Sequence, residues 1–241
     1  MFISTKFISS SSGKILVALS AFNAVSYSTD NGITWNSGNI CGDHGPIFSV
    51  TWNGSIFVAT GSAPYCATSS DGVNWTLRDM PFDADWDTVA WNGSIFVACR
   101  RGAGIDKIAV SNDGITWTQV TVPIITAQVG IAWNGSVFCI ITSTGTIALT
   151  SPDGFTWTQR TIPFLGQRNS IRWTGSFFSV IGSQGSSYLT SPDGITWTIR
   201  TLPFSGVPTG IIWNGDITCL ITVSSIGPNN IALSPDGINW T

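Results

Sequence analysis

Short apolar runs separated by Gly-containing turns extend along the whole chain. Five turns share the pattern Trp-Asn-Gly-Ser or a close variant, and each is followed by a largely apolar run, as in Trp52-Asn-Gly-Ser-Ile-Phe-Val58. The copies begin at Trp52, Trp91, Trp133, Trp173 and Trp213. Asn-Gly between two apolar runs is the strongest short signal of a β-hairpin, because both turn residues must adopt a positive φ. A hairpin is therefore predicted at each copy.

A second phrase, Ser-x-Asp-Gly-x-x-Trp with small variations, recurs in phase with the first. Its six glycines stand at positions 32, 72, 114, 154, 194 and 237, so that successive copies are 40 to 43 residues apart. Each repeat then holds four strands. One ends at the Trp-Asn-Gly turn, one is the run after it, one leads into the Asp-Gly turn, and one carries the Trp-Thr that follows. A period of about 40 residues with four strands predicts a β-propeller, one blade per repeat.

The repeats predict an all-β fold, a six-bladed β-propeller that forms a single domain over residues 1–241. The expected blades cover approximately residues 1–42, 43–82, 83–124, 125–164, 165–204 and 205–241. The sequence stops at Trp240-Thr241, where the fourth strand of the sixth blade begins, and its first residues take up the repeat near the end of that phase. We expect the blades to close into a ring, since closure removes exposed sheet edges that promote aggregation.

Composition and charge narrow the classes of function. Charged residues make up 10% of the chain, the net charge is −3 and no basic run is present, which argues against nucleic-acid binding. No apolar run approaches the about 18 residues of a membrane helix, so membrane insertion is not expected. The apolar stretch from Lys14 to Ala21 is in register with the second strand of the other repeats. We interpret it as a strand rather than as a signal peptide.

The cysteines and the histidine give no sign of a metal or cofactor. The five cysteines are odd in number and show no Cys-x-x-Cys spacing. Cys139 and Cys219 share a position at which other repeats have valine, and we predict them to be small buried hydrophobic residues. Cys41 and Cys66 fall in predicted loops and are the one pair open to a disulfide. With one histidine, His44, and no metal-ligand spacing, neither a metal site nor a cofactor is expected.

The second phrase resembles the Asp-box, or BNR, repeat of sialidase-type propellers. Residues 28–35 match its spacing, with Asp30 two residues before Gly32, whereas the other five copies have the acid directly before glycine. The two phrases together are similar to repeats of phage virion and tail-associated proteins and of some bacterial surface proteins. The resemblance implies a propeller at a virion or extracellular surface, with a cytoplasmic location as the alternative. In such turns Asp and Ser side chains accept backbone hydrogen bonds, so the six repeated acids are expected to be structural.

The segments that do not repeat are where we expect function. In an up-and-down blade the two repeated turns lie at one face, and the remaining loops and the crossovers between blades lie at the other. On that second face the repeats diverge completely, as in Cys41-Gly-Asp-His-Gly-Pro46, Asp83-Ala-Asp-Trp-Asp87 and the loop from Arg100 to Lys107. A constant scaffold at one face and individual loops at the other predict a binding surface on a rigid frame.

Trp86 is the one tryptophan of twelve outside the repeated positions. Beside Asp83 and Asp85, it suggests an exposed ring that stacks on a sugar while the carboxylates take its hydroxyls; the alternative is that Trp86 caps the first strand of its blade. Arginines on the same face form a candidate clasp for an anionic group such as a carboxylate. The full candidate ligand-binding set is Trp86, Asp83, Asp85, Arg100, Arg101, Asp43, His44, Tyr65, Arg168 and Asn169.

We expect a non-enzymatic recognition propeller that binds carbohydrate or protein, such as a surface glycan or a protein receptor. One alternative is an assembly or cement protein that contacts neighbouring subunits of a larger particle. A weaker one is a sialidase-like glycoside hydrolase. Against catalysis, all thirteen acidic residues are aspartates, six of them lie in the repeated turns, and nothing marks a catalytic carboxylate pair. The identity of the ligand and the oligomeric state are left open.

Overall fold

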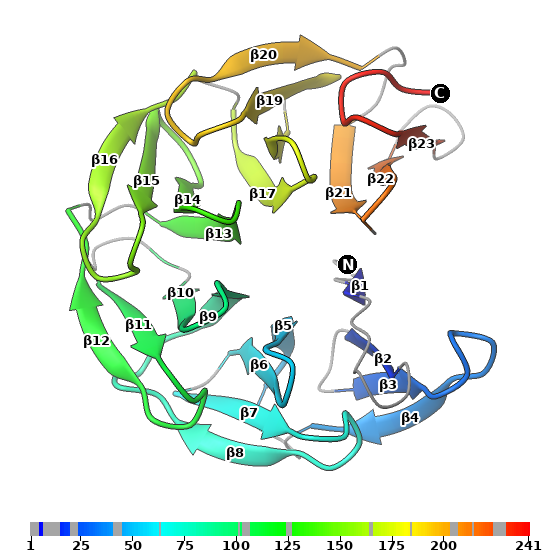
Figure 1. The fold of residues 1–241 in the computed structure, drawn as a ribbon, viewed down its shortest axis with the longest axis vertical. Helices are drawn as coiled ribbons and strands as arrows, with labels where there is room; N and C mark the ends of the chain where they lie inside the picture. Colours follow the sequence, from blue (N-terminus) through cyan, green and yellow to red (C-terminus); the bar gives the residue numbers. More distant parts are fainter. Residues whose placement is uncertain are drawn as a thin grey trace. The chain divides into compact units, whose positions relative to one another are not determined.

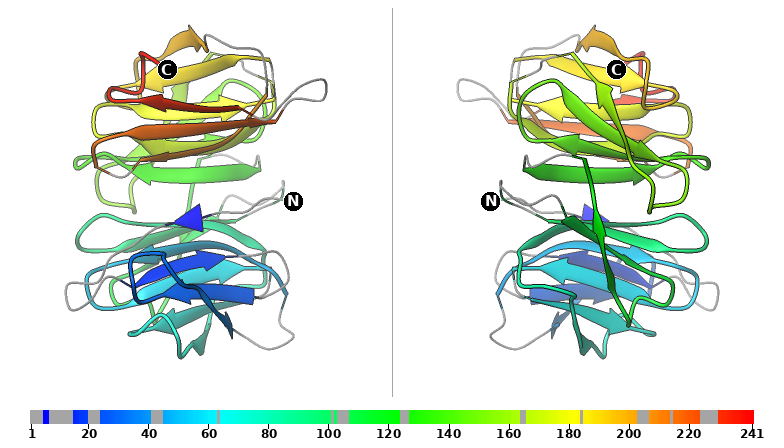
Figure 2. Two further views of the ribbon diagram at one scale, coloured as in Figure 1. Left: turned by 90° about the vertical axis from the view of Figure 1, so that its right-hand side faces the viewer. Right: turned by 90° about the vertical axis from the view of Figure 1, so that its left-hand side faces the viewer.

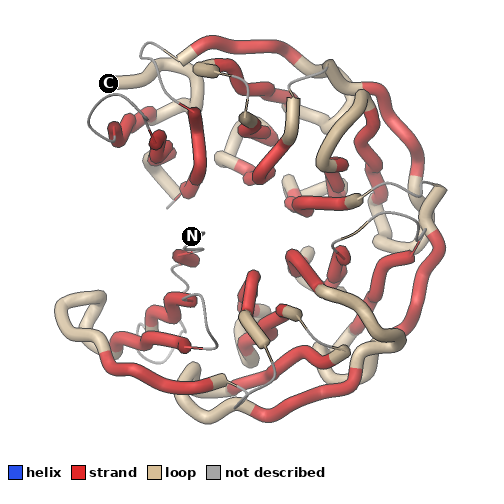
Figure 3. The backbone as a smooth tube through the Cα atoms, turned by 180° about the vertical axis from the view of Figure 1, so that it is seen from behind, coloured by secondary structure: helices blue, strands red, loops and turns tan. Residues whose placement is uncertain are grey.

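The structure, a computed structural model, describes residues 5–6, 15–19, 24–40, 45–62, 64–100, 102, 107–123, 127–163, 166–183, 185–202, 207–213, 215–223 and 230–241. These residues form strands and loops, with no helix among them (Figure 3). Judged by its internal contacts, the chain divides into two compact units. Unit 1 contains residues 1–101 and 107–121, and unit 2 contains residues 102–106 and 122–241.

Unit 1 consists of three four-stranded antiparallel sheets in which strands that follow one another in the chain are hydrogen-bonded neighbours (Figure 1). The first sheet is formed by β1 (Thr5–Lys6), β2 (Leu16–Leu19), β3 (Ala24–Ser28) and β4 (Asn36–Asn39). The second is formed by β5 (Ile47–Trp52), β6 (Phe57–Gly61), β7 (Tyr65–Ser69) and β8 (Thr76–Asp79). The third is formed by β9 (Trp86–Trp91), β10 (Phe96–Arg100), β11 (Lys107–Ser111) and β12 (Thr118–Thr121).

Unit 2 also holds three antiparallel sheets, whose strands run alongside one another (Figure 2). The first is formed by β13 (Gln128–Trp133), β14 (Phe138–Thr142), β15 (Ile147–Ser151) and β16 (Thr158–Thr161). The second is formed by β17 (Arg168–Trp173), β18 (Phe178–Gly182), β19 (Ser187–Ser191) and β20 (Thr198–Thr201). The third is formed by β21 (Val207–Trp213), β22 (Thr218–Val223) and β23 (Asn230–Ser234). Two backbone hydrogen bonds of 3.0 and 2.9 Å then join Leu233 to Thr241, where the fourth strand of this sheet begins.

Six successive sheets, each built by one repeat, are the blades of a six-bladed β-propeller, and the predicted fold class is confirmed. The single domain, the blade boundaries and the closure of the ring stay predictions. None of the described residues belongs to a helix long and apolar enough to cross a membrane.

The repeated Asn-Gly turns set the register of the first hairpin in each blade. Trp52 pairs with Phe57 across the turn, and Gly54 adopts a φ of +101°, which disfavours any residue with a Cβ. The Asn53 side-chain oxygen accepts hydrogen bonds of 2.8 Å from the backbone N–H groups of Ser55 and Ile56. The side chain therefore satisfies donors that the turn itself leaves unpaired. The predicted hairpin forms, but Gly54 has a positive φ and Asn53 does not, so the expectation of a positive φ at both residues was wrong.

A β-bulge interrupts the first strand of every blade from the second to the sixth. In β9, for example, Cys99 pairs with Thr88 but Arg100 pairs with Trp86, so that Asp87 is left out of the ladder. Equivalent shifts occur in β5, β13, β17 and β21. A bulge adds one residue to one strand and so reverses the inside–outside alternation beyond it. The first residue of β5, β9, β13 and β17 consequently points in a direction that simple alternation does not predict.

The core of each unit lies between neighbouring sheets. Phe57 is fully buried, with its ring centroid 4.3 Å from that of Trp52 and 6.1 Å from that of Trp75. Phe96 and Phe138 are held in the same way by the two repeated tryptophans of their own blades. In these three blades the two repeated tryptophans therefore enclose one phenylalanine.

The cysteines are part of this packing. Cys66, Cys99 and Cys139 are buried thiols, and Cys219 is half-buried. Burial raises the pKa of the Cys139 thiol well above its ordinary range. The structure places Cys66 on β7 rather than in a loop, with its Sγ 3.9 Å from the carbonyl oxygen of Gly114, whereas Cys41, its suggested disulfide partner, lies outside the described residues.

Candidate functional site

The Asp-Gly turns are closed hydrogen-bond networks. Asp153 Oδ1 accepts hydrogen bonds from Ser151 Oγ at 3.0 Å, from the backbone N–H of Phe155 at 2.9 Å and from that of Thr156 at 2.7 Å. Ser151 Oγ in turn accepts the Gly154 N–H at 2.8 Å. The backbone N–H of Thr156 is the main cause of a lowered pKa for Asp153. The expected structural role of these acids thus has a geometric basis, because Asp153 Oδ1 accepts all three hydrogen bonds from groups of its own turn.

The first copy keeps the network although its acid is shifted by one position. Ser28 Oγ lies 2.7 Å from Asp30 Oδ1 and accepts the Gly32 N–H at 2.8 Å. The longer turn is accommodated by Asn31, which adopts a left-handed φ of 63°. Hydrogen bonds from the side chain and backbone of Thr34, with a further one from Ser28, lower the pKa of Asp30 to about 2.

The repeated turns share one end of the sheets. In unit 2 the Asn134 side-chain amide donates to the carbonyl of Pro192 at 3.3 Å, which joins an Asn-Gly turn to the Asp-Gly turn of the next sheet. At the opposite sheet ends of unit 1, the Ser62 N–H donates to Pro46 and the Met80 N–H donates to Pro64, both at 2.9 Å. We call the sheet ends with the Asn-Gly and Asp-Gly turns the repeat side. The opposite ends, which in unit 1 carry Pro46, Ser62, Pro64 and Pro81 to Asp85, are the variable side.

Half of the predicted binding residues meet on the variable side of unit 1. Asp83 and Asp85 are exposed, Tyr65 is half-buried at the start of β7, and an isolated bridge joins Asp85 to Ser62. Trp86 and Arg100 are direct partners in the β9–β10 ladder. These residues come from the second and third blades, which the bridge between Ser62 and Asp85 joins at this end of the sheets.

Four further predicted residues are not tested by the structure. Asp43, His44 and Arg101 lie outside the described residues. Asn169 lies on β17, in the position that the bulge leaves out of the ladder, and its side chain is not described. Asp43 and His44 therefore stay predicted members of the binding set.

Trp86 is not the exposed platform that its acidic neighbours suggest. Its side chain is 0% exposed and packs in a cluster with Cys66, Met80 and Val89. Its ring centroid lies 4.8 Å from that of Phe82. The bulge in β9 accounts for the difference, because it turns the first residue of the strand toward the core. The expectation of a sugar-stacking ring was wrong, and the alternative, a cap on the first strand, is what the structure shows.

Arg168 is likewise no part of an open anion clasp. Its side chain is 2% exposed, and its guanidinium donates to the carbonyl of Thr142 at 3.1 Å and to that of Pro163 at 3.2 Å. A third hydrogen bond goes to the carbonyl of Gly145. Arg168 stands at the first position of β17, as Trp86 does in β9, and joins the loop of the preceding sheet to the crossover. Its expected ligand-binding role is replaced by a structural one.

Arg100 retains unused hydrogen-bonding capacity. The residue is half-buried, and its Nε and Nη1 atoms are buried with no hydrogen-bond partner in the described part of the chain. The indole Nε1 of its ladder partner Trp86 is also buried without one. Buried polar groups in folded proteins almost always have a partner, so these donors call for an acceptor such as a water, an ion or a group of a bound molecule.

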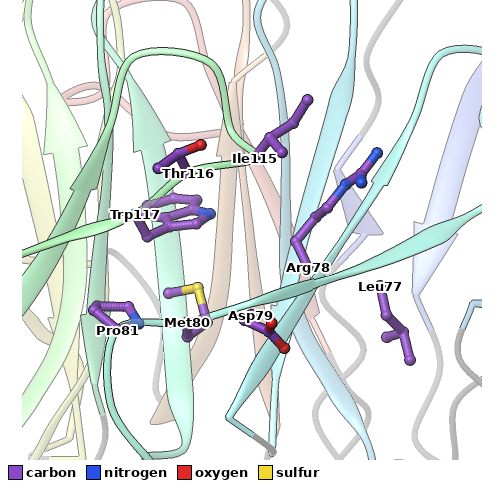
Figure 4. Close-up of a pocket in the computed structure, with 8 residues that line it drawn as sticks. All are labelled: Leu77, Arg78, Asp79, Met80, Pro81, Ile115, Thr116 and Trp117. Atoms are coloured by element: carbon purple, nitrogen blue, oxygen red, sulfur yellow. The ribbon is translucent and has the colours of Figure 1, made fainter.

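An open pocket of about 500 Å³ lies elsewhere in unit 1, between β8 and the Asp-Gly turn that precedes β12 (Figure 4). Figure 4 shows Trp117, Met80 and Pro81 on one side of it, Ile115 above, and Arg78 with its guanidinium directed away from Trp117. Arg78 Nε donates to Thr68 Oγ1 at 3.1 Å. Arg160 and Arg200 make the same bond in their own blades, to Thr150 and Thr190. The pocket is built from residues of the repeat, and we assign it to the scaffold.

Comparison with known proteins identifies the fold of this chain but not its family. No family model matches the sequence, and no curated protein matches it. A structure of YCF48 bound to a D1 peptide is 16% identical, with 93% of this chain and 75% of that chain covered and a TM-score of 0.69. A catalytically inactive virginiamycin B lyase from Staphylococcus aureus with quinupristin is 14% identical, with 89% and 75% covered and a TM-score of 0.75. The β-propeller domain of Cps50 (Swd1) from Myceliophteria thermophila is 12% identical, with 100% and 85% covered and a TM-score of 0.70. This likeness shows the fold alone.

One functional position was missed in the sequence. The residue five places before the Trp of each Asn-Gly turn differs in every blade of this propeller: it is Ile47, Trp86, Gln128, Arg168 and Pro208. Gln128 is 1% exposed, and neither atom of its amide has a hydrogen-bond partner among the described residues. Alignment of the repeats against their first strands shows that this position, like the bulged position after it, differs in all five of these blades.

Proposed function

We propose that this chain is a non-enzymatic recognition propeller whose variable side binds an extended segment of a partner protein. One contrast carries the proposal. On the repeat side the carboxylates of the Asp-Gly turns are bonded within their own turns, as at Asp153. On the variable side Arg100 and Trp86 hold buried donors without a partner in the described residues. A specific interface requires hydrogen-bonding groups that differ from blade to blade, have no partner within the protein and are held on a rigid scaffold.

A protein partner is favoured over a carbohydrate. The sugar-binding hypothesis depended on an exposed Trp86, and that ring is buried. A propeller of the same fold, YCF48, forms a complex with a peptide. The same proposal includes presentation at a virion, tail or cell surface, as the resemblance of the repeats implies. The experiment below distinguishes this recognition role from a role in the assembly of a particle.

A catalytic role is not part of the proposal, although a lyase shares the fold. A general acid must hold a proton near the working pH. The backbone N–H of Thr156 lowers the pKa of Asp153, and the side chain and backbone of Thr34 do the same for Asp30, so these carboxylates stay charged. Asp83 and Asp85 are exposed to water. Binding accounts for the variable side without a chemical step.

The test is a screen of the purified chain against an array of short random peptides and an array of glycans. Two matched double variants accompany the wild type. Asp83→Ser with Asp85→Ser removes two exposed carboxylates from the variable side, and Asn112→Ala with Thr116→Ala changes two exposed residues on the repeat side of the same blade. We expect peptide binding that the first variant weakens by about tenfold or more and the second leaves unchanged, with the same melting temperature for all three.

Binding to glycans alone would replace the protein partner with a sugar. Loss of binding in the repeat-side variant only would reverse the assignment of the two sides. If a well-folded chain binds neither array, the recognition role is rejected in favour of an assembly role.

A further inference from the structure

Trp86 and Arg100 are the two ends of one hydrogen-bonded ladder. Trp86 is the first residue of β9, Arg100 is the last residue of β10, and the two are paired in register beyond the bulge. Residues paired across antiparallel strands lie on the same face of the sheet. Both side chains therefore lie at the same sheet end on the variable side, next to the exposed Asp85.

This pair is the one place on the variable side of unit 1 where buried donors of two paired side chains lack partners in the described residues. They are Trp86 Nε1, Arg100 Nε and Arg100 Nη1. All three groups are donors that cannot accept a hydrogen bond. The group that satisfies them must consequently be an acceptor, and the guanidinium favours one that is negatively charged.

The equivalent pairs in other blades carry other chemistry. The pair Gln128 and Thr142 also holds a buried amide without a partner in the described residues, but that amide is uncharged and has an acceptor as well as a donor. The pair Ile47 and Gly61 brings no side-chain donor to the position. Arg168 pairs with Gly182, and its guanidinium donates to three backbone carbonyls, so that among the described residues its Nε alone is buried without a partner. Arg168, whose role is structural, thus finds most of its hydrogen-bond acceptors within the protein. Arg100 differs, because two of its nitrogens are left without such carbonyls.

We propose that Arg100 and the Trp86 indole N–H form a binding site for a carboxylate of the partner segment. This inference rests on the proposed function and names the chemistry that the variable side recognises. A carboxylate accepts hydrogen bonds at both oxygens and neutralises the guanidinium. The nearby Asp83 and Asp85 are exposed and negatively charged, which disfavours a doubly charged phosphate and favours a segment that carries a cationic side chain beside its carboxylate.

The site can be observed directly by NMR, because the Arg Nε–H and Trp Nε1–H groups give signals of their own. The probes are N-acetylglutamate, its uncharged counterpart N-acetylglutamine amide, and inorganic phosphate, all at constant ionic strength. The Arg100 signal is assigned by its loss in Arg100→Lys. Arg78 and Arg160, whose Nε–H groups already donate to threonine hydroxyls, are internal controls.

We expect N-acetylglutamate to shift the Arg100 Nε–H and Trp86 Nε1–H signals saturably, while the signals of Arg78 and Arg160 stay in place. N-acetylglutamine amide should have no effect, and the Trp86 shift should vanish in Arg100→Gln. No saturable shift at Arg100 would overturn the proposal. So would equal shifts at Arg78, which would indicate a general salt effect, or a response to phosphate alone, which would assign the site to another anion.

Peptides from the array then separate this inference from the proposed function. Each binding peptide is prepared with its acidic side chains and C-terminus intact and with them amidated. We expect amidation and Arg100→Gln each to weaken binding by about tenfold, and Arg78→Gln to have no effect. If peptides bind through the variable side but tolerate both changes, the carboxylate site is wrong while the recognition role stands. If no peptide binds but the NMR shifts occur, the recognition role fails and the anion site stands.

Discussion

The indole Nε1 of Trp240 donates a hydrogen bond of 3.0 Å to the hydroxyl of Tyr188, which belongs to the preceding blade. Tyr188 in turn donates to the carbonyl of Gly237 at 3.2 Å. In the other five Asp-Gly turns the corresponding tryptophan donates directly to the glycine carbonyl of its own turn. The tyrosine hydroxyl is therefore inserted into a hydrogen bond of the repeat and links the last two blades.

Replacement of Tyr188 by Phe should destabilise the protein by about 1–3 kcal/mol, because one change removes the partner of both the Trp240 N–H and the Gly237 carbonyl. Urea denaturation followed by tryptophan fluorescence measures the loss. Tyr27→Phe, at a half-buried tyrosine on β3, is the control and should change stability less. Equal losses in the two variants would show that the inserted hydroxyl has no special role.

Trp86→Ala should destabilise the protein by about 3–5 kcal/mol, because the side chain is fully buried against Phe82 and Met80. The free energy of unfolding from urea titration is the measurement. Asp83→Ala with Asp85→Ala, at exposed neighbouring positions, should leave it within about 0.5 kcal/mol of the wild type. A Trp86→Ala protein of unchanged stability would mean that the ring is exposed in solution.

Gly114→Ala should be more harmful than Gly93→Ala, although both glycines have a positive φ. A Cβ at Gly93 (φ +103°) meets nothing within 4 Å, whereas one at Gly114 (φ +73°) would lie 2.6 Å from Val58 Cγ2. We expect about 1–2 kcal/mol at Gly93 from backbone strain, and a further 1–3 kcal/mol or so at Gly114 from overpacking. Thermal melting of the two variants tests the difference, and similar losses would contradict the tight packing of this turn.

The contribution of Asp30 to the free energy of unfolding should be lost at acidic pH and retained at neutral pH. Its pKa is lowered from 3.8 to about 2 in the folded protein, mainly by hydrogen bonds from Thr34, so the folded state binds its proton less readily than the unfolded state does. The contribution is therefore fully present above about pH 4 to 5 and falls as the pH drops toward 2. Urea titrations of wild type and Asp30→Asn between pH 7 and pH 2 should show a stability gap that is constant at first and then narrows. A gap that persists at pH 2 would contradict the lowered pKa.

Most of the fold follows from short phrases of the sequence. Asn53-Gly54 and its copies specify hairpins because the asparagine side chain and the glycine backbone satisfy the turn locally. The Ser-Asp-Gly phrases specify the second turn of each blade in the same way, as Ser151 and Asp153 illustrate. Repetition then gives six sheets of the same order. These features are predictable because each depends on residues only a few positions apart.

The candidate site was predicted in place but not in the role of each residue. The divergent loops identified the variable side, and Asp83, Asp85, Tyr65, Trp86 and Arg100 do meet there. The sequence left open whether Trp86 is exposed or caps its strand, because the bulge that turns it inward leaves no mark in the pattern of apolar residues. The use of Arg168 as a structural link depends on carbonyls that lie 5 to 26 positions away in the sequence.

By itself the sequence determined the number of blades, the two turns of each blade and the separation of a constant side from an individual one, since local hydrogen bonds and a regular period decide these features. Only the tertiary structure decided which polar side chains are satisfied within the protein. Arg168 and Arg100 are both arginines at the end of an inner hairpin. Arg168 donates to three backbone carbonyls and leaves its Nε without a partner in the described residues, whereas Arg100 leaves both Nε and Nη1 without one. That difference is set by the path of the neighbouring loops, because a buried donor is satisfied only by an acceptor that another segment brings within about 3 Å of it.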